Sequence, residues 1–156
     1  MKKYYITTPI IMKLLEEKLN IDSITVMVQK EVADRLTEIP GGKNTGAITY
    51  CVYYYSEPQE VLTVPNTSFV PEPKVCSEVI KLNIRKEPPV VLKDEKIFFK
   101  VVKASFMQRR KTLLNGLANA GIASKEKLKE ILQELNLSEN VRGESLSIEK
   151  FAEIAN

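Results

Sequence analysis

The sequence contains no histidine and no tryptophan, and only two cysteines and six glycines occur among its 156 residues. Without histidine, imidazole acid–base catalysis and histidine-ligated metal sites are excluded. Cys51 and Cys76 lie too far apart in sequence for a metal-binding knuckle, and two thiols do not make a disulfide framework. We therefore expect reduced thiols and no metal site.

Three longer patterns are also missing. No apolar run approaches the roughly 18 residues that cross a bilayer, and no secretory leader opens the chain. Neither glycine-rich pattern that cradles phosphates, G-x-G-x-x-G or G-x-x-x-x-G-K, occurs. The sequence therefore predicts a cytoplasmic protein with no membrane partner, whose residues here include no cofactor-binding loop.

The composition is that of a folded and mildly basic protein. Hydrophobic residues make up 44% of the chain and charged residues 28%, which suits one ordinary core or two small ones. The formal net charge is +3, and the isoelectric point is near 8.8. Such a charge permits a nucleic-acid partner without requiring one.

The first part of the chain has the pattern of an α/β sheet. Thr8 and Pro9 predict the N-cap and the first position of a helix over residues 9–18. The β-branched apolar run 24–28 is typical of a strand covered on both faces, and residues 29–36 have a helical pattern. We interpret this series as the later part of such a sheet.

A β-rich stretch follows. Residues 48–55, 60–64 and 77–85 each combine β-branched or aromatic residues in the manner of strands, and 77–85 alternates as a strand with one solvated face does. Between the last two lies FVPEP, residues 69–73, a stiff proline loop that cannot be a central strand.

Two consecutive prolines, Pro88 and Pro89, predict a domain boundary, because they stop any element and favour an extended linker. We expect an α/β domain over residues 1–88 and a small all-helical domain over residues 89–156. The predicted helices of this second domain span residues 95–120, 124–135 and 147–155.

The helix predicted from residue 95 is rich in cations. At 100° per residue, five of them share an arc of about 100° opposite an apolar side. They are Lys96, Lys100, Lys103, Arg110 and Lys111. Arg109 falls on the apolar side, where we expect it to pair with a buried acceptor or to meet the other domain. From charge alone, the stripe is equally compatible with a solvated helix face and with a phosphate-binding surface.

Five separated segments, in this order, are similar to KsgA-type ribosomal RNA adenine dimethyltransferases. They are YYITTPII at 4–11, VQKEVADR at 28–35, FVPEPKVCS at 69–77, FMQRRKTL at 106–113 and RGESL at 142–146. The resemblance implies a Rossmann-like methyltransferase sheet followed by a small helical domain. It also implies transfer of methyl groups from S-adenosylmethionine to the N6 atoms of two adjacent adenosines near the 3′ end of small-subunit rRNA. The implied partners are that rRNA and the immature small ribosomal subunit.

The same resemblance assigns site residues. The catalytic loop of the family has the sequence Asn-Leu-Pro-Tyr, and Tyr4 matches its tyrosine, whereas Met1, Lys2 and Lys3 stand where Asn-Leu-Pro would be. Tyr4 and Phe69 match the positions that hold a flipped adenine between aromatic planes, since a base must leave its stack to be methylated. Without the resemblance, Phe69 is more simply an aromatic that anchors its loop.

We interpret the chain as the C-terminal portion of such an enzyme, without its cofactor-binding half and therefore inactive and free of S-adenosylmethionine. A non-catalytic RNA-binding or ribosome-assembly module is the alternative, and the resistance methyltransferases of large-subunit rRNA are a third. The strand at 24–28 is expected to expose an edge and an apolar face. We expect the segment up to residue 28 to be displaced, swapped or self-associated through that edge.

Overall fold

The computed structural model describes the backbone of residues 2–108 and 110–156, and side chains from residue 8 onward except residue 109. The first half of the chain forms α1 (Lys2–Glu16), β1 (Ser23–Gln29), α2 (Lys30–Thr37), α3 (Ala47–Tyr55), β2 (Ser56–Val64), the short 3-10 helix η1 (Asn66–Ser68) and β3 (Ser77–Ile84). The second half forms α4 (Glu95–Phe106), α5 (Leu113–Asn119), α6 (Lys125–Glu134), η2 (Gly143–Ser145) and α7 (Ile148–Ala155).

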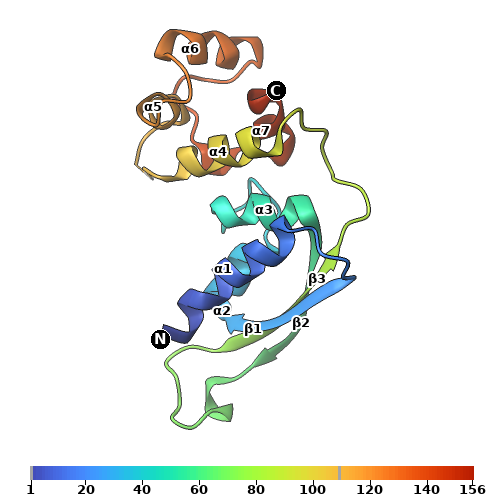
Figure 1. Ribbon diagram of the computed structural model, residues 1–156. Coiled ribbons are helices and arrows are strands. Elements are labelled where there is room, and N and C mark those ends of the chain that lie inside the picture. Colours follow the sequence, from blue (N-terminus) through green and yellow to red (C-terminus); the bar gives the residue numbers. More distant parts are fainter. Residues whose placement is uncertain (1, 109) are drawn as a thin grey trace.

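The three strands form one antiparallel sheet in the order β1-β3-β2. Helices α1, α2 and α3 lie against one face of it (Figure 1). Ile80 and Leu82 of β3 are fully buried on that face, whereas Met27 and Leu62 on the other face remain 44% and 52% exposed. The prediction that residues 24–28 are covered on both faces is therefore wrong, because the described helices cover one face only.

Both outer strands of the sheet have an unpaired edge among the described residues, and the edge of β1 is the one that the sequence indicates. In the part of the chain that the structure describes, β1 pairs with β3 on one side and with no strand on the other. The segment before it is not displaced, since Ile11 and Leu15 of α1 are 1% and 3% exposed in the core under the sheet. Self-association through this edge stays a prediction.

Helix α1 begins earlier than the sequence indicates. It runs from Lys2, so that Pro9 lies inside it and Thr8 is not its N-cap. Proline lacks one N–H for the helical hydrogen bonds, which weakens a helix at that turn. Ile11 and Leu15, four residues apart, dock the helix onto the sheet, and this packing outweighs the local preference for a start at Pro9.

The segment predicted as a strand at 48–55 is the helix α3, so that prediction is wrong. Tyr50 and Tyr54, four residues apart, point into the core of the helical half, while Val52 packs under the sheet. The Gly46 N–H donates to the Thr49 hydroxyl at 3.0 Å, which satisfies one free donor at the helix start. Burial on both sides overrides the β-propensity of tyrosine and β-branched residues.

The predicted helix 95–120 is two helices, α4 and α5, separated by residues 107–112. Thr112 begins the second, because its hydroxyl accepts a hydrogen bond from the Asn115 N–H at 3.3 Å. The prediction of one helix is wrong because apolar periodicity continued across this cap. The other predicted helices and strands are present, with Ser124 and Ser147 as N-caps.

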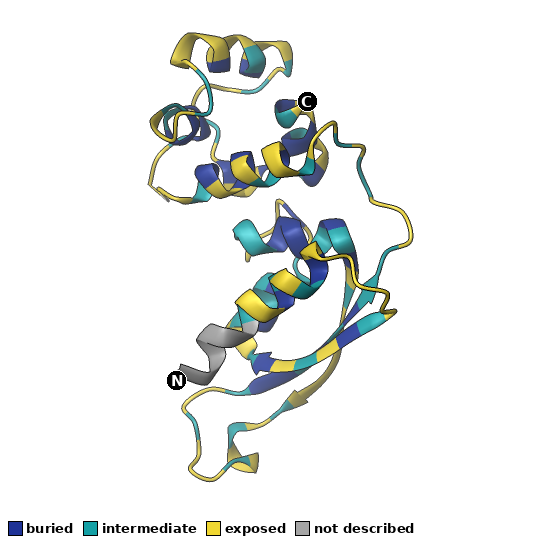
Figure 2. Cartoon of the chain, viewed as in Figure 1, coloured by how far each residue is buried: buried dark blue, intermediate teal, exposed yellow. Residues whose placement is uncertain are grey.

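The described residues form two hydrophobic cores, one under the sheet and one inside the helical half (Figure 2). Residues 85–94, which join β3 to α4, contain no helix or strand. The boundary at residues 88 and 89 stays a prediction, and α3 contributes side chains to both cores. No helix in the described part of the chain is long and apolar enough to cross a bilayer.

Candidate nucleic-acid interface

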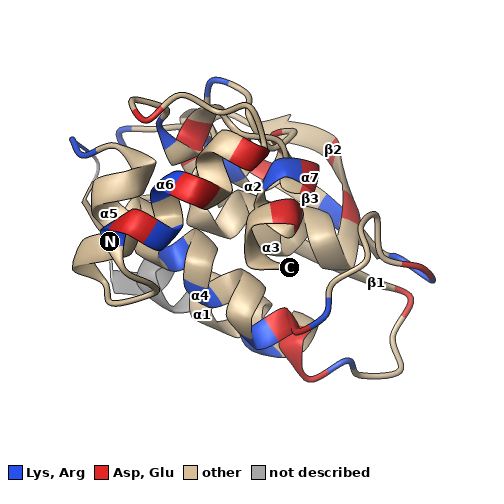
Figure 3. Cartoon of the chain, turned by 90° about the horizontal axis from the view of Figure 1, so that it is seen from above, with Lys and Arg blue, Asp and Glu red and all other residues tan. Residues whose placement is uncertain are grey.

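Three lysines project from the outer side of α4. Phe98, Val101 and Val102 face the core at 0–2% exposure, so the opposite positions point to solvent. Those positions hold Lys96, Lys100 and Lys103, all exposed. Among the described residues, none of the three lies within ion-pair distance of a carboxylate. In Figure 3 the basic positions of α4 follow a single acid at its start, whereas acidic and basic positions alternate along α6.

The other two predicted cations are not on this helix. Arg110 and Lys111 lie in the connection between α4 and α5, where both are exposed and the Lys111 N–H donates to the Gln108 carbonyl at 3.0 Å. The stripe of five cations on one helix is therefore replaced by three lysines on α4 and two cations on the loop that follows it. Arg109 lies outside the described residues.

The proline loop is the long connection between β2 and β3. Phe69 in it is half-buried and belongs to neither hydrophobic core of the described residues, and Val70 beside it is 99% exposed. The Asn66 side chain donates to the Pro73 carbonyl at 3.3 Å and so closes the loop across its base. An aromatic outside both cores on a closed loop is compatible with stacking against a ligand.

The predicted site residues do not form one cluster. The proline loop extends from the end of the sheet that lies away from the helical half, while the lysines lie on that half (Figure 1). The side chain of Tyr4 lies outside the described residues. Any RNA that contacts both Phe69 and the α4 lysines must therefore extend along the molecule.

The RGESL segment joins the two halves. Its turn η2 packs against the end of α4, where a Cβ added at Gly143 would lie 2.9 Å from the Ser105 Oγ and 3.0 Å from its Cβ. The Tyr50 hydroxyl of α3 donates to the Leu146 carbonyl at 2.6 Å and lies 3.1 Å from the Gly143 carbonyl. The sequence analysis used this segment only for the family resemblance. In the structure its contacts connect the two halves of the molecule, and we call such a connecting set of contacts a joint.

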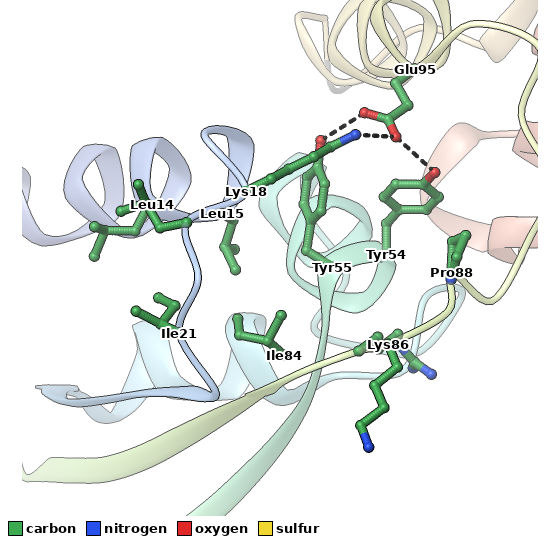
Figure 4. A pocket seen from close by; sticks show the side chains of 12 residues that line it. Leu14, Leu15, Lys18, Ile21, Tyr54, Tyr55, Ile84, Lys86, Pro88 and Glu95 are labelled. Carbon is green, nitrogen blue, oxygen red and sulfur yellow. Dashed lines mark hydrogen bonds and ion pairs between the residues drawn. The ribbon is translucent and has the colours of Figure 1, made fainter.

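A second joint lies at Glu95, which sequence reasoning missed. Its carboxylate accepts hydrogen bonds from the Tyr54 and Tyr55 hydroxyls at 3.1 and 3.2 Å and from the Lys18 ammonium at 3.1 Å (Figure 4). These groups border a cavity of about 320 Å³ whose apolar lining includes Leu14 and Ile84. No sequence spacing reveals this cluster, because its members come from three separate elements.

The joint changes the acidity of its members. Burial raises the pKa of Tyr54 to about 12, and the negative charge of Glu95 adds to that effect. Burial and the Glu95 charge also raise the pKa of Tyr55. Burial of Glu95 opposes its ionisation, but hydrogen bonds from Lys18 and Tyr54 and the charge of Lys18 hold its pKa below the usual value. Neutral phenols and an ionised carboxylate are therefore the stable states.

Alkaline pH should loosen this joint. The folded pKa of Tyr54, about 12, is above the ordinary phenol value of about 10, so its contribution to stability is complete below pH 10 and is lost between about pH 10 and 12. As the pH rises from 10 to 12, the free energy of unfolding measured in urea should fall less for Tyr54→Phe than for the unmodified chain. Equal pH dependence in both would contradict the assignment.

The model of the family described as ribosomal RNA adenine dimethylase matches residues 3–156. The chain belongs to this family. The mixed α/β fold followed by helices, which the sequence predicts, is confirmed, because the chain has the fold of two solved methyltransferases.

Curated relatives of the same family are similar over nearly the whole chain. Ribosomal RNA small subunit methyltransferase A from Geobacillus sp. (strain WCH70) is 51% identical over 156 residues, which are 98% of this chain and 54% of the relative. The protein of the same name from Clostridioides difficile (strain 630) is 52% identical over 153 residues, with 98% and 53% covered. The chain thus spans about half the length of these relatives.

Two solved structures have the same fold at low sequence identity. A dimethyladenosine transferase from Plasmodium falciparum superposes with a TM-score of 0.78 at 22% identity, covering 97% of this chain and 62% of that one. The 23S rRNA methyltransferase ErmE superposes with a TM-score of 0.67 at 20% identity, covering 97% and 60%. At these identities the likeness describes the fold alone.

Proposed function

We propose that these residues belong to an S-adenosylmethionine-dependent rRNA adenine N6,N6-dimethyltransferase that modifies two adjacent adenosines near the 3′ end of small-subunit rRNA. Its partner is the immature small ribosomal subunit in the cytoplasm. The observation that carries the proposal is the identity of about half of all residues, over 98% of the chain, with relatives named small-subunit rRNA methyltransferases. The large-subunit branch is disfavoured, because the curated relatives that match at about 50% identity are named small-subunit rRNA methyltransferases.

Within this function, we assign RNA backbone binding to the cations of α4 and the loop after it. Lys96, Lys100 and Lys103 recur on one exposed helix face, with Arg110 and Lys111 exposed close by in sequence. Ammonium groups free of carboxylate partners can bind phosphates without first breaking an ion pair. The stacking of a flipped adenine is assigned to Phe69 and to Tyr4, which matches the family's catalytic-loop tyrosine in sequence, although its backbone belongs to α1 in this structure.

RNA binding should depend on the α4 lysines. The double variant Lys100→Glu and Lys103→Glu should lower affinity for a structured small-subunit rRNA fragment about tenfold or more at low salt. The salt slope should fall by about two, because each lost phosphate contact removes about one. Fluorescence anisotropy at several salt concentrations measures both quantities.

The matched control changes two lysines of α6. Lys125→Glu and Lys129→Glu alter the net charge by the same amount on exposed positions of the same helical half, where Glu126 and Glu130 already interleave with the lysines. We expect a small change in affinity from this control. If both double variants lose affinity equally, net charge rather than the α4 surface accounts for binding.

The residues of this chain alone should neither bind S-adenosylmethionine nor methylate rRNA. They contain no glycine-rich turn for the cofactor, and methyl transfer requires the sulfonium and the adenine amino group to be aligned by the protein. Calorimetric titration with the cofactor should give no saturable heat. Micromolar binding, or methylated adenosine after incubation with undermethylated small subunits, would refute this expectation.

A non-catalytic RNA-binding or ribosome-assembly role is the second candidate. The observation in its favour is that the α4 lysines, Arg110 and Lys111 lie on the helical half, away from the proline loop. A graft of this chain onto the remaining half of a curated relative distinguishes the two candidates. Methylation by that graft supports the enzyme, whereas RNA binding without methylation supports the module.

A further inference from the structure

Three carboxylates from three different elements meet at one edge of the sheet domain. Asp34 of α2, Glu60 of β2 and Glu78 of β3 each place a carboxylate oxygen within 4.8 Å of the other two. These positions are 26 and 18 residues apart in sequence, so they do not form a recognisable metal-binding motif. The sequence predicts no metal site, and the tertiary structure creates this cluster.

A β-bulge aligns two of the acids. β2 pairs Glu60 with Ile80 and Thr63 with Glu78, and the register shifts between Glu60 and Leu62. Residues three apart on a regular strand face opposite sides, but the extra residue of a bulge puts Glu60 and Thr63 on the same face. That face is the one to which Glu78 points, so the bulge turns Glu60 toward Glu78.

Helix α2 packs against this face of the sheet and carries the third acid. Ala33 and Leu36 of α2 are fully buried against the sheet, which sets the rotation of the helix. Lys30 and Asp34, one turn apart, then lie together beside Glu78. The Lys30 ammonium is 2.8 Å from the Asp34 carboxylate and 3.2 Å from the Glu78 Oε1.

The Glu78 carboxylate is only partly satisfied by these contacts. Glu78 is 3% exposed, and its Oε1 accepts from the Thr63 hydroxyl at 3.3 Å as well as from Lys30. Its Oε2 is buried and has no hydrogen-bond partner among the described residues. A buried carboxylate oxygen without a partner is costly, and such an atom in a cluster of acids can accept a cation as its partner.

The net charge of the cluster also favours a bound cation. Three carboxylates and one ammonium sum to two negative charges, and no second Lys or Arg of the described residues lies within ion-pair distance of the three acids. Glu60 receives only a 3.4 Å contact from the Thr37 hydroxyl, which also donates to the Ala33 carbonyl at 2.8 Å. A divalent cation in place of the Lys30 ammonium would reduce the net charge of the cluster from two negative charges to one.

We propose that Asp34, Glu60 and Glu78 bind one calcium-sized divalent cation, and that the Lys30 ammonium moves into solvent when the ion binds. Calcium–oxygen bonds of about 2.3–2.6 Å join oxygens up to roughly 4.6–5.2 Å apart, whereas magnesium at about 2.0–2.1 Å joins oxygens only to about 4.2 Å. Oxygens that lie within 4.8 Å of one another are inside the reach of calcium without rearrangement of the backbone. Lys30 can leave because its side chain is 47% exposed at the first residue of α2.

Calcium titration of the chain tests the proposal. In buffer freed of divalent ions, isothermal calorimetry should show one saturable site with a Kd of the order of 10⁻⁴ M, typical of weak oxygen-ligand sites. Glu78→Gln keeps the shape of the side chain and should weaken binding at least tenfold. Lys30→Gln removes the competing cation and should strengthen binding several-fold. Far-UV circular dichroism verifies that each variant is folded.

The matched control is Glu72→Gln, which removes one negative charge from the exposed proline loop outside the cluster. It should bind calcium as the unmodified chain does. The proposal is overturned if no saturable heat appears, if Glu72→Gln and Glu78→Gln weaken binding equally, or if Lys30→Gln weakens it. Magnesium binding as tight as calcium binding would overturn the assignment of ion size.

Discussion

Replacing Phe69 by alanine should lower rRNA methylation by one to two orders of magnitude while leaving affinity for the whole rRNA nearly unchanged. Stacking of one base on an aromatic ring contributes about 1–3 kcal/mol, and the flipped adenine is the base that must be held during the reaction. The loss should therefore appear in turnover rather than in binding. Because this chain spans about half of its relatives, the measurement needs a graft of it onto the missing half of the Geobacillus relative.

The neighbouring residue offers the control. Val70 is 99% exposed on the same loop, so Val70→Ala removes a side chain of the loop without removing an aromatic plane. Methylation by this variant should be close to that of the unmodified graft. Fluorescence of 2-aminopurine at the target position reports whether the base leaves its stack. Equal flipping and equal turnover in Phe69→Ala would make Phe69 a loop anchor rather than a stacking residue.

Gly143→Ala should destabilise the helical half by about 1–3 kcal/mol, the usual cost of overpacking a close contact. The new methyl group would lie 2.9 Å from the Ser105 Oγ, 3.0 Å from its Cβ and 3.3 Å from the Phe151 Cζ. Ser105 cannot easily turn away, since its hydroxyl donates to the Val102 carbonyl at 2.7 Å. Chemical denaturation followed by circular dichroism measures the difference.

The same substitution at Gly116 should have the opposite sign. A Cβ there would lie 3.5 Å from the Ala104 carbonyl oxygen, an ordinary contact, and Gly116 lies inside α5. Alanine is more favourable than glycine in a helix interior by up to about 1 kcal/mol. Gly116→Ala should therefore leave stability unchanged or raise it. If Gly143→Ala proves equally harmless, the close approach of η2 to α4 does not limit packing.

The two joints matter for the proposed function because they connect the predicted RNA-binding surfaces. Tyr50 bonds to the η2 turn, and Tyr54 and Tyr55 bond to Glu95 at the start of α4. All three tyrosines belong to α3, which also packs under the sheet that carries the proline loop. The position of the α4 lysines relative to Phe69 therefore depends on one short helix.

The elements with strong local signals are those that could be predicted. Alternation in residues 77–85 and the serine caps at Ser124 and Ser147 each specify their element within a few residues, and each is present. The lysines of α4 also followed from periodicity, because Phe98 and Val101 mark the buried side of that helix. Such signals act between near neighbours in sequence, so they do not depend on the rest of the fold.

Other features were decided only in three dimensions. The tyrosine-rich segment 47–55 is a helix because two cores bury it from both sides, and no residue within it indicates this. The contacts of Glu95 with Lys18 and Tyr54, and those among the three acids near Lys30, join residues that are distant in sequence. The sequence alone determined the family, the local elements and the charge of α4. The tertiary structure decided the joints and the acidic cluster, because hydrogen bonds and ion pairs depend on distances in space that separation along the chain does not encode.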